Sequence, residues 1–329
     1  MKSIALKNIL VTGAAGLVGT AVVRRLAADG QSLTATDMRD ANVPDGVRFE
    51  AADLTNQTAM AALLQCHAVD TVIHCGAISG PMVAADDPHL VAAVNVGGTL
   101  NLAEAARKAG VTRFLALSST SVYGLQATLN PVTEDAPLNA TDVYGASKIA
   151  MEAILRAYRY DLGVPTIVLR IASVYGPGRT TDCFIRDLIR SAAAGTAISL
   201  FDEDGFRRQI IHIDDVARSI VQSISAKVWN DFAYNIGGGE WLTERELAAL
   251  AARILPRLQV AAVPAPARCI DGYMGPLDFS RASAAFGYAP QTGISQGIAS
   301  YAEHLAVEVL LTDPKPKWQA FCLVPIAHI

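Results

Sequence analysis

Two groups of residues have the types and spacing that chemistry on a small molecule requires. In the first, Tyr144 and Lys148 stand four positions apart in the run YGASK, which places both side chains on one face of a helix. A free tyrosine, with a pKa of about 10, is a weak base at neutral pH. Because a nearby ammonium group stabilises the phenolate, we expect Lys148 to lower the pKa of Tyr144. Ser119 ends an upstream apolar run, where its hydroxyl can bridge the phenol and a substrate oxygen.

The second group is a glycine-rich turn. Residues 12–19 read TGAAGLVG and lie between a short apolar run and a segment with helical spacing. Glycine lets the backbone approach a pyrophosphate closely, and a helix N-terminus offers it unpaired N–H groups. The pattern favours a dinucleotide site over an ordinary glycine-rich turn. Asp37, at the end of the next apolar run, can accept hydrogen bonds from ribose hydroxyls and would repel a 2′-phosphate, which favours NAD over NADP. The positive charge of an oxidised nicotinamide would act with Lys148 to lower the pKa of Tyr144.

These residues must be positioned by the elements around them. Apolar runs that predict strands alternate with helical patterns over the first half of the chain. The strands are expected at 8–12, 32–37, 47–51, 70–75, 113–118 and 165–171, and the helices at 17–28, 56–65, 87–109 and 142–162. Such alternation predicts an α/β protein of the Rossmann type, a doubly wound parallel sheet with crossover helices.

The alternation loosens after residue 175. Further helices are expected at 182–194, 215–226, 243–254 and 294–311, among clusters of glycine and proline. We therefore predict that residues 1–175 form the dinucleotide-binding domain, to which parts of 205–240 return. Residues 176–311 then form mainly a smaller C-terminal substrate-binding lobe. The tail, 312–329, has no role that its composition suggests.

Composition excludes several other classes of protein. The 329 residues are 51% hydrophobic and 18% charged, which is typical of a folded protein, and the net charge of −4 argues against nucleic acid as a partner. No continuous apolar run of about 20 residues predicts a membrane span, and no signal peptide is recognisable, so we expect a cytoplasmic protein. The five cysteines are odd in number and widely spaced, and the histidines show no paired ligand spacing. We therefore expect neither disulfides nor a metal.

The motifs together resemble those of the extended short-chain dehydrogenases/reductases, in the NAD-dependent epimerase/dehydratase family. The resemblance covers about residues 8–310 and is carried by residues 12–19, 53–54, 74–77, 95–99, 118–124, 144–148, 170–178 and 208–215. It implies that Tyr144 exchanges a proton with a sugar hydroxyl, Lys148 holds the nicotinamide ribose and Ser119 hydrogen-bonds the reacting oxygen. It further implies an NAD site formed by Gly13, Ala15, Gly16, Leu17, Val18, Gly19, Asp37, Asp53, Leu54, Gly76, Ala77, Asn95, Ser118, Tyr144 and Lys148.

The substrate side departs from the family pattern. The expected substrate residues are Ser79, Ser119, Ser173, Arg208 and Arg268. Sugar-nucleotide members usually carry an asparagine at the position of Ser173, which contacts the substrate diphosphate. Arg208 and Arg268 can grip a diphosphate or, equally, the carboxylate of a sugar acid. Residues 120–121 are Thr-Ser where dehydratases of the family have Asp-Glu, which argues against water elimination.

Three functions remain open from the sequence. The first is an NAD-dependent epimerase of a sugar or nucleotide sugar, which oxidises a carbon to a keto intermediate and returns the hydride to the other face. The second is a dehydrogenase or reductase of a free sugar, sugar acid or small alcohol, which Ser173 favours. The third, a non-catalytic dinucleotide sensor, is disfavoured because both Tyr144 and Lys148 are present. The resemblance also implies a homodimer, formed by the helix after Asn95 and the helix that carries Tyr144.

Overall fold

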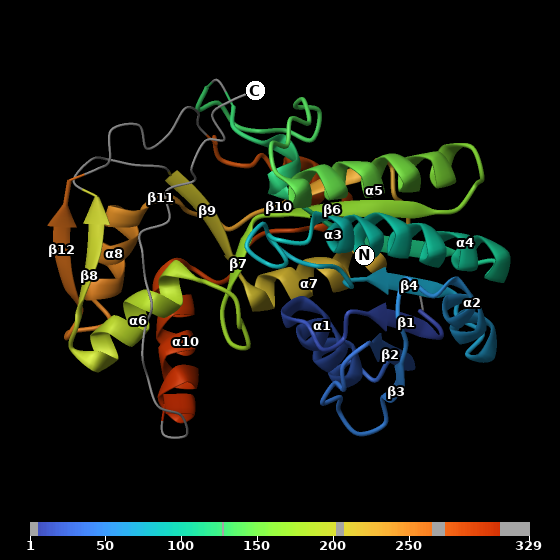
Figure 1. The fold of residues 1–329 in the computed structure, drawn as a ribbon, viewed down its shortest axis with the longest axis horizontal. Coiled ribbons are helices and arrows are strands. Elements are labelled where there is room, and N and C mark those ends of the chain that lie inside the picture. The colour runs from blue at the N-terminus through green and yellow to red at the C-terminus, as the bar shows by residue number, and fades with distance from the viewer. Residues whose placement is uncertain (1–5, 127, 202–206, 265–273, 310–329) are drawn as a thin grey trace.

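A seven-stranded parallel sheet forms the centre of the protein (Figure 1). The computed structural model describes residues 6–126, 128–201, 207–264 and 274–309. The strand order is β10-β6-β5-β4-β1-β2-β3. The strands are β1 (Ile9–Thr12), β2 (Leu33–Asp37), β3 (Arg48–Ala51), β4 (Thr71–His74), β5 (Arg113–Ser119), β6 (Thr166–Ile171) and β10 (Ala233–Ile236). The order reverses between β1 and β4, so the predicted doubly wound sheet is confirmed, and a ligand crevice is expected at this reversal.

Helices cover both faces of the sheet, which explains why its central strands are apolar throughout. One face carries α1 (Leu17–Ala28), α7 (Ile213–Ile224) and α9 (Ser280–Phe286), and the other carries α2 (Gln57–Cys66), α4 (Thr99–Ala109) and α5 (Val143–Tyr160). Ile9, Leu10 and Val11 of β1 are fully buried between these layers. Burial of each such side chain contributes about 1.5–3 kcal/mol, so β1 is held firmly where the glycine turn begins.

The single helix expected over residues 87–109 is divided into three parts. It begins as α3 (Pro88–Ala92), passes through a π-helical turn at Ala93–Gly98 and continues as α4 to Gly110, whose left-handed backbone ends it. A π turn does not change the direction in which the helix runs, but it changes which side chains face inward. Here it accompanies the burial of Asn95, which is 1% exposed, against the sheet.

A smaller lobe lies beside the carboxyl ends of the strands. It contains α6 (Phe184–Ala194), α8 (Glu244–Ala252) and α10 (Ile294–Val309), which share a core with β8 (Ala197–Phe201). Strand β12 (Gln259–Val263) pairs with β8 in parallel. A second sheet, formed by β7 (Ser173–Tyr175), β9 (Arg207–His212) and β11 (Trp241–Thr243), lies between this lobe and the main sheet (Figure 1). The buried carboxylate of Asp215 on α7 accepts the backbone N–H groups of Gln291 and Thr292, which joins the lobe to the main domain.

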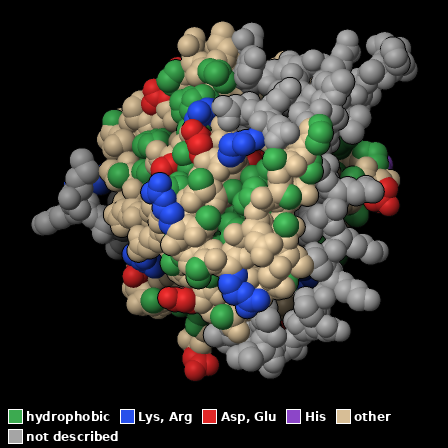
Figure 2. Space-filling view, turned by 90° about the vertical axis from the view of Figure 1, so that its left-hand side faces the viewer, with side chains coloured by type: hydrophobic (Ala, Val, Ile, Leu, Met, Phe, Trp, Pro, Cys, Tyr) green, Lys and Arg blue, Asp and Glu red, His purple; other side chains and the backbone are tan. Residues whose placement is uncertain are grey.

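The surface of the smaller lobe is mixed in character. On the face shown in Figure 2, Lys and Arg side chains are dispersed among Asp, Glu and apolar ones instead of forming one patch.

In the part of the chain that the structure describes, no helix is long and apolar enough to cross a membrane. The tail, 312–329, lies outside the described residues.

Candidate functional site

The glycine turn packs directly on the strand beside it. Gly13 has a left-handed backbone with φ of 70°, and a β-carbon there would lie 2.5 Å from the backbone nitrogen of Gly76. A β-carbon on Gly19 would lie 2.0 Å from the carbonyl oxygen of Gly13, so neither position admits a side chain. The close packing brings the turn after β1 against the loop after β4, at the strand reversal where a ligand is expected.

Helix α1 begins at this turn with no side-chain cap. Its N-cap, Gly16, makes no side-chain hydrogen bond, whereas Asn56, Asp87 and Asp142 cap the helices that follow them. Uncapped N–H groups of the first turn, which begins with Leu17 and Val18, need an acceptor from elsewhere. A pyrophosphate supplies such acceptors and benefits from the positive end of the helix dipole, so the turn fits a dinucleotide.

The predicted adenosine side lies along the same edge of the sheet. Asp37 accepts the backbone N–H of Ala15 at 3.1 Å and that of Arg39 at 3.0 Å, which fixes its carboxylate at the end of β2 beside the turn. The carboxylate of Asp53 accepts the N–H of Thr55 at 2.8 Å. The side chain of Leu54 lies against Gly76, as a β-carbon on that glycine would meet Leu54 Cδ1 at 2.7 Å. The predicted cofactor residues of β1, β2 and β4 are therefore close together.

The three residues expected to do the chemistry come from two neighbouring elements. Tyr144, on the first turn of α5, has a phenol whose pKa the side chains of Ser119 and Ser79 and the backbone of Gly80 each lower, which places these groups close to it. The hydroxyl of Ser119 donates to Ser121 Oγ at 3.1 Å. Ser79 is exposed in the loop after β4 and Ser119 ends β5, so serine hydroxyls from two elements lie near the phenol. A substrate alcohol in this position would face a phenol and serine hydroxyls at once.

Lys148 lies one helical turn below Tyr144. Its side chain is 4% exposed, and Nζ donates to the carbonyl oxygen of Leu117 at 2.9 Å and lies 5.9 Å from the centre of the Tyr144 ring. Burial lowers the pKa of Lys148 to about 8, although the neighbouring Cys75 and Glu152 act in the opposite direction. The ammonium is therefore close enough to influence the phenol but bonds to the strand.

The expected lowering of the Tyr144 pKa is not found in the protein alone. Burial is the largest influence and raises the pKa of Tyr144, while hydrogen bonds from Ser119 and Ser79 partly offset it. Desolvation of the buried phenolate outweighs an ammonium that is bound to Leu117, so Lys148 does not lower this pKa without the oxidised nicotinamide that the prediction also invoked.

Two predicted cofactor residues have their side chains engaged within the protein. Asn95 accepts the N–H of Ile78 at 2.8 Å and donates to its carbonyl at 3.0 Å and to Ser147 Oγ at 2.9 Å. It thereby joins the loop after β4 to helix α5. Ser118 donates to Glu152 Oε1 at 2.5 Å. In this structure, the side chains of both residues connect neighbouring elements around the site.

Of the residues expected to contact the substrate, only some can be placed near one another in this structure. Ser173 is exposed at the start of β7, where its Cα pairs with Ile210 of β9. Arg208 lies two residues before Ile210 and pairs with Glu244 at 3.2 Å. Arg268 lies outside the described residues.

A buried ion pair behind the catalytic set was not identified from the sequence. Arg170 of β6 and Glu152 of α5 are 1% and 3% exposed and meet at 2.7 Å. A usable signal was present, because a buried charge nearly always has a partner. Arg170 interrupts the apolar strand TIVLRI, and Glu152 follows Lys148 by one helical turn on its buried face.

No group of three or more His, Cys, Asp or Glu side chains that could hold a metal ion occurs within the described ranges. The two buried histidines have other roles. His74 hydrogen-bonds two threonines, and His212 caps α7 through its side chain.

Comparison with known proteins identifies relatives along the chain. Residues 9–237 match the model of the NAD dependent epimerase/dehydratase family. A UDP-glucose 4-epimerase of Mycolicibacterium smegmatis is 32% identical over 314 residues, which cover 89% of this chain and 97% of that protein. The UDP-glucose 4-epimerase of Thermotoga maritima, solved with UDP-glucose, superposes with a TM-score of 0.84 at 25% identity, covering 92% of this chain and 99% of that one. The Thermus thermophilus UDP-glucose 4-epimerase, solved with NAD, has a TM-score of 0.80 at 28% identity, covering 91% and 99% of the two chains.

Proposed function

The chain belongs to the NAD-dependent epimerase/dehydratase family, and we propose that it is an NAD-dependent epimerase of a nucleotide sugar. The observation that carries the proposal is that Ser119 and Lys148 both lie close to Tyr144. The glycine turn nearby begins a helix that has no side-chain cap. Similarity to UDP-glucose 4-epimerases along nearly the whole chain supports a UDP-sugar as the first substrate to test.

Each residue of the set has a distinct role in this proposal. NAD, when bound along residues 13–19 and 76–77, would accept a hydride from a sugar carbon and return it in the second step. Tyr144 accepts the proton of the sugar hydroxyl. It gives the proton back after the keto sugar has rotated to present its other face. Ser119 donates a hydrogen bond to the reacting oxygen, which stabilises its developing charge. Lys148, still largely protonated below its pKa of about 8, favours the phenolate and reaches toward the nicotinamide ribose.

The residues after Ser119 favour epimerisation over dehydration. Thr120 and Ser121 form the short turn beyond β5, and Ser121 is hydrogen-bonded to Ser119. Neither side chain titrates near neutral pH, so the turn contributes no additional acid or base for removing water.

One observation favours a dehydrogenase as the second candidate. Ser173 is exposed on β7 in place of an asparagine, and its hydroxyl offers fewer hydrogen bonds to a diphosphate than an amide does. A smaller substrate, such as a free sugar or sugar acid, would tolerate this change.

Measurement of cofactor retention separates the two candidates. The protein is purified without added nucleotide and denatured, and the released NAD(H) is quantified. UDP-glucose is then offered, and both UDP-galactose and NADH are followed. Near-stoichiometric NAD with interconversion of the two sugars supports the epimerase. An empty protein that accumulates NADH from sugars or sugar acids supports the dehydrogenase. Tyr144→Phe should abolish turnover and keep NAD, and turnover by this variant would contradict the assigned roles.

We further propose that the enzyme is a cytoplasmic homodimer formed by α4 and α5. Ala103, Ala105 and Ala106 of α4 and Leu155 of α5 are buried in the core between these helices and the sheet, so they are not available for this contact. Exposed apolar side chains on the same helices include Leu100 and Val143, at 41% and 47% exposure. Within the described residues, Cys66, Cys75 and Cys183 are free thiols.

A further inference from the structure

The buried pair of Glu152 and Arg170 contacts the catalytic segment at two points. Glu152 Oε1 accepts Ser118 Oγ at 2.5 Å and Arg170 Nε at 3.0 Å, and its Oε2 accepts Arg170 Nη2 at 2.7 Å. The remaining guanidinium nitrogen, Nη1, donates to Tyr123 Oη at 3.0 Å. Ser118 and Tyr123 lie on either side of Ser119 and the turn that follows it. One ion pair therefore contacts the segment both before and after the serine that meets Tyr144.

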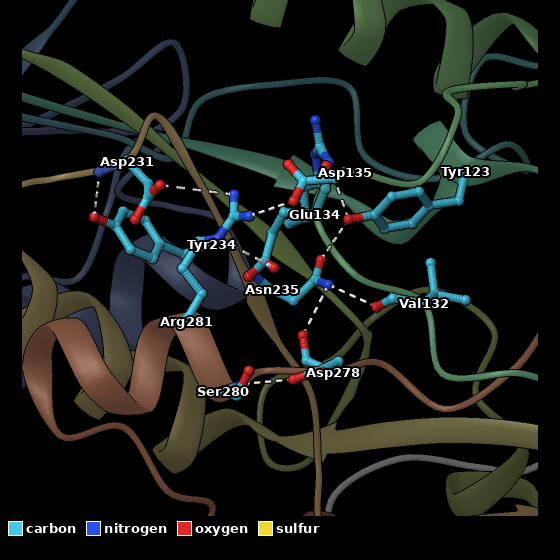
Figure 3. Close-up of polar contacts among 11 residues, drawn as sticks. Tyr123, Val132, Glu134, Asp135, Asp231, Tyr234, Asn235, Asp278, Ser280 and Arg281 are labelled. Atoms are coloured by element: carbon cyan, nitrogen blue, oxygen red, sulfur yellow. Dashed lines mark hydrogen bonds and ion pairs between the residues drawn. The ribbon is translucent and has the colours of Figure 1, made fainter.

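The contact at Tyr123 continues to β10 and to the segment that precedes α9. Figure 3 shows the hydroxyl of Tyr123 directed at Asn235, whose Oδ1 accepts it at 2.6 Å. The amide nitrogen of Asn235 donates to the carbonyls of Val132 and Asp278, at 2.9 and 3.0 Å. Val132 also pairs with Leu277 in an isolated bridge. The far side of the catalytic turn is thus attached to the chain around residues 276–278.

These contacts involve two neighbouring serines. Ser118 donates to Glu152, and Ser119, the next residue, acts on Tyr144, so two consecutive serines at the end of β5 are both tied to helix α5. Glu152 also follows Lys148 by one turn of α5, so it fixes the helix that carries Tyr144 against the strand that carries Ser119.

Stability alone is a weak reason to keep such a pair. Desolvation of two buried charges can exceed their mutual attraction, and well-packed apolar residues often replace a buried ion pair without loss of stability. We propose that Glu152 and Arg170 are positioning residues, which hold both ends of residues 118–123 and α5 so that Ser119 faces Tyr144. This inference rests on the function proposed above.

Arg170→Lys and Tyr123→Phe are the informative variants. Lysine keeps the charge but lacks the planar fork that reaches Glu152 and Tyr123 together. Tyr123→Phe leaves the ion pair intact and releases only the far end of the turn, so it remains testable if Arg170→Lys fails to fold. Asp29→Asn is the control, because it removes a carboxylate from an exposed pair with Arg25 of α1 at 3.6 Å, which has no contact with this network.

The assay follows UDP-glucose turnover, bound NAD and the ionisation of Tyr144. A misplacement of about 1 Å costs roughly 100-fold in rate, so we expect kcat to fall roughly 10- to 100-fold in Arg170→Lys and less in Tyr123→Phe. KM and bound NAD should stay close to those of Asp29→Asn. The pKa of Tyr144, read from phenolate absorbance against Tyr144→Phe, should shift in Arg170→Lys because the Ser119 contact is displaced.

The outcomes separate this inference from the proposed function. The positioning role is overturned if folded Tyr123→Phe and Arg170→Lys keep the kcat of the control and the wild-type Tyr144 pKa. It is also overturned if kcat falls only in parallel with loss of NAD and folded protein. Absence of turnover in the wild type with every UDP-sugar contradicts the proposed function instead. The Tyr144 titration still tests the positioning role in that case, since it needs no substrate.

Discussion

Acidification should destabilise this protein through His74, a buried histidine beside the proposed NAD site. His74 ends β4 and is 2% exposed. Its Nδ1 lies 2.7 Å from Thr12 Oγ1, and its Nε2 lies 3.0 Å from Thr99 Oγ1. Burial lowers the pKa of His74 to about 3, and the charge of Lys148 acts in the same direction. The folded protein therefore holds this imidazole neutral.

The hydrogen bonds around His74 have one consistent direction. Thr99 donates its hydroxyl to the carbonyl of Asn95 at 2.6 Å, so it accepts from Nε2–H of His74. Thr12 accepts the N–H of Gly76 at 3.2 Å and is thus free to donate to Nδ1. Protonation of Nδ1 forces the Thr12 hydroxyl to rotate and accept a hydrogen bond instead of donating it, next to the glycine turn.

The magnitude follows from the two pKa values. The unfolded chain has a histidine pKa of 6.5, and the folded protein has about 3. Between these values the unfolded state binds more protons than the folded state. The stability that depends on neutral His74 is therefore fully present above pH 6.5 and is lost as pH falls toward 3. At about 1.4 kcal/mol per pKa unit, His74 alone removes about 3 kcal/mol by pH 4.5.

The assay compares the wild type with His74→Gln, whose amide can still accept from Thr12 and donate to Thr99. Urea unfolding is measured in steps from pH 7.5 to 4.5, and released NAD is measured at each pH. The variant should start less stable and lose less on acidification, by about 3 kcal/mol. A difference between the two proteins that stays constant within about 0.5 kcal/mol over this range would refute the reasoning. Other acid-sensitive groups are common to both proteins and cancel.

Three further predictions concern the cofactor turn, the smaller lobe and the dimer. Gly19→Ala places a β-carbon 2.0 Å from the Gly13 carbonyl, so purified protein should lose its NAD and about 1–3 kcal/mol of stability, whereas Gly97→Ala, which meets nothing within 4 Å, should retain the cofactor. Burial raises the pKa of Asp187 to about 7, above its value of 3.8 in the unfolded chain, so its ionisation costs stability as pH rises between these values. Asp187→Asn should therefore stabilise the protein at pH 8 by about 1–3 kcal/mol in urea unfolding and have little effect near pH 4; an unchanged midpoint at pH 8 would contradict the cause given. Leu100→Glu should convert a dimer to monomers in light-scattering measurements, while Val228→Glu, at a more exposed position elsewhere, should not.

Local patterns were enough to predict the sheet and to select the candidate catalytic residues. The apolar runs, the glycine spacing and the i, i+4 relation of Tyr144 to Lys148 each depend on residues close together in the chain. Helix and strand geometry converts such spacing directly into position. For that reason the parallel sheet, the glycine turn and the serine at the end of β5 follow from the order of residues alone.

The contacts that orient those residues depended on the tertiary structure. Ser118 turns to Glu152, Arg170 reaches Tyr123, and Asn95 joins the loop after β4 to α5. Each bond joins elements far apart in the chain, and the π turn that accompanies the burial of Asn95 has no clear pattern in the residues around it. The pKa of Tyr144 likewise depended on burial, which only the assembled fold decides. Residue types and spacing determined which groups were available, and packing at long sequence separation decided which of them meet, because burial and partner depend on the whole fold.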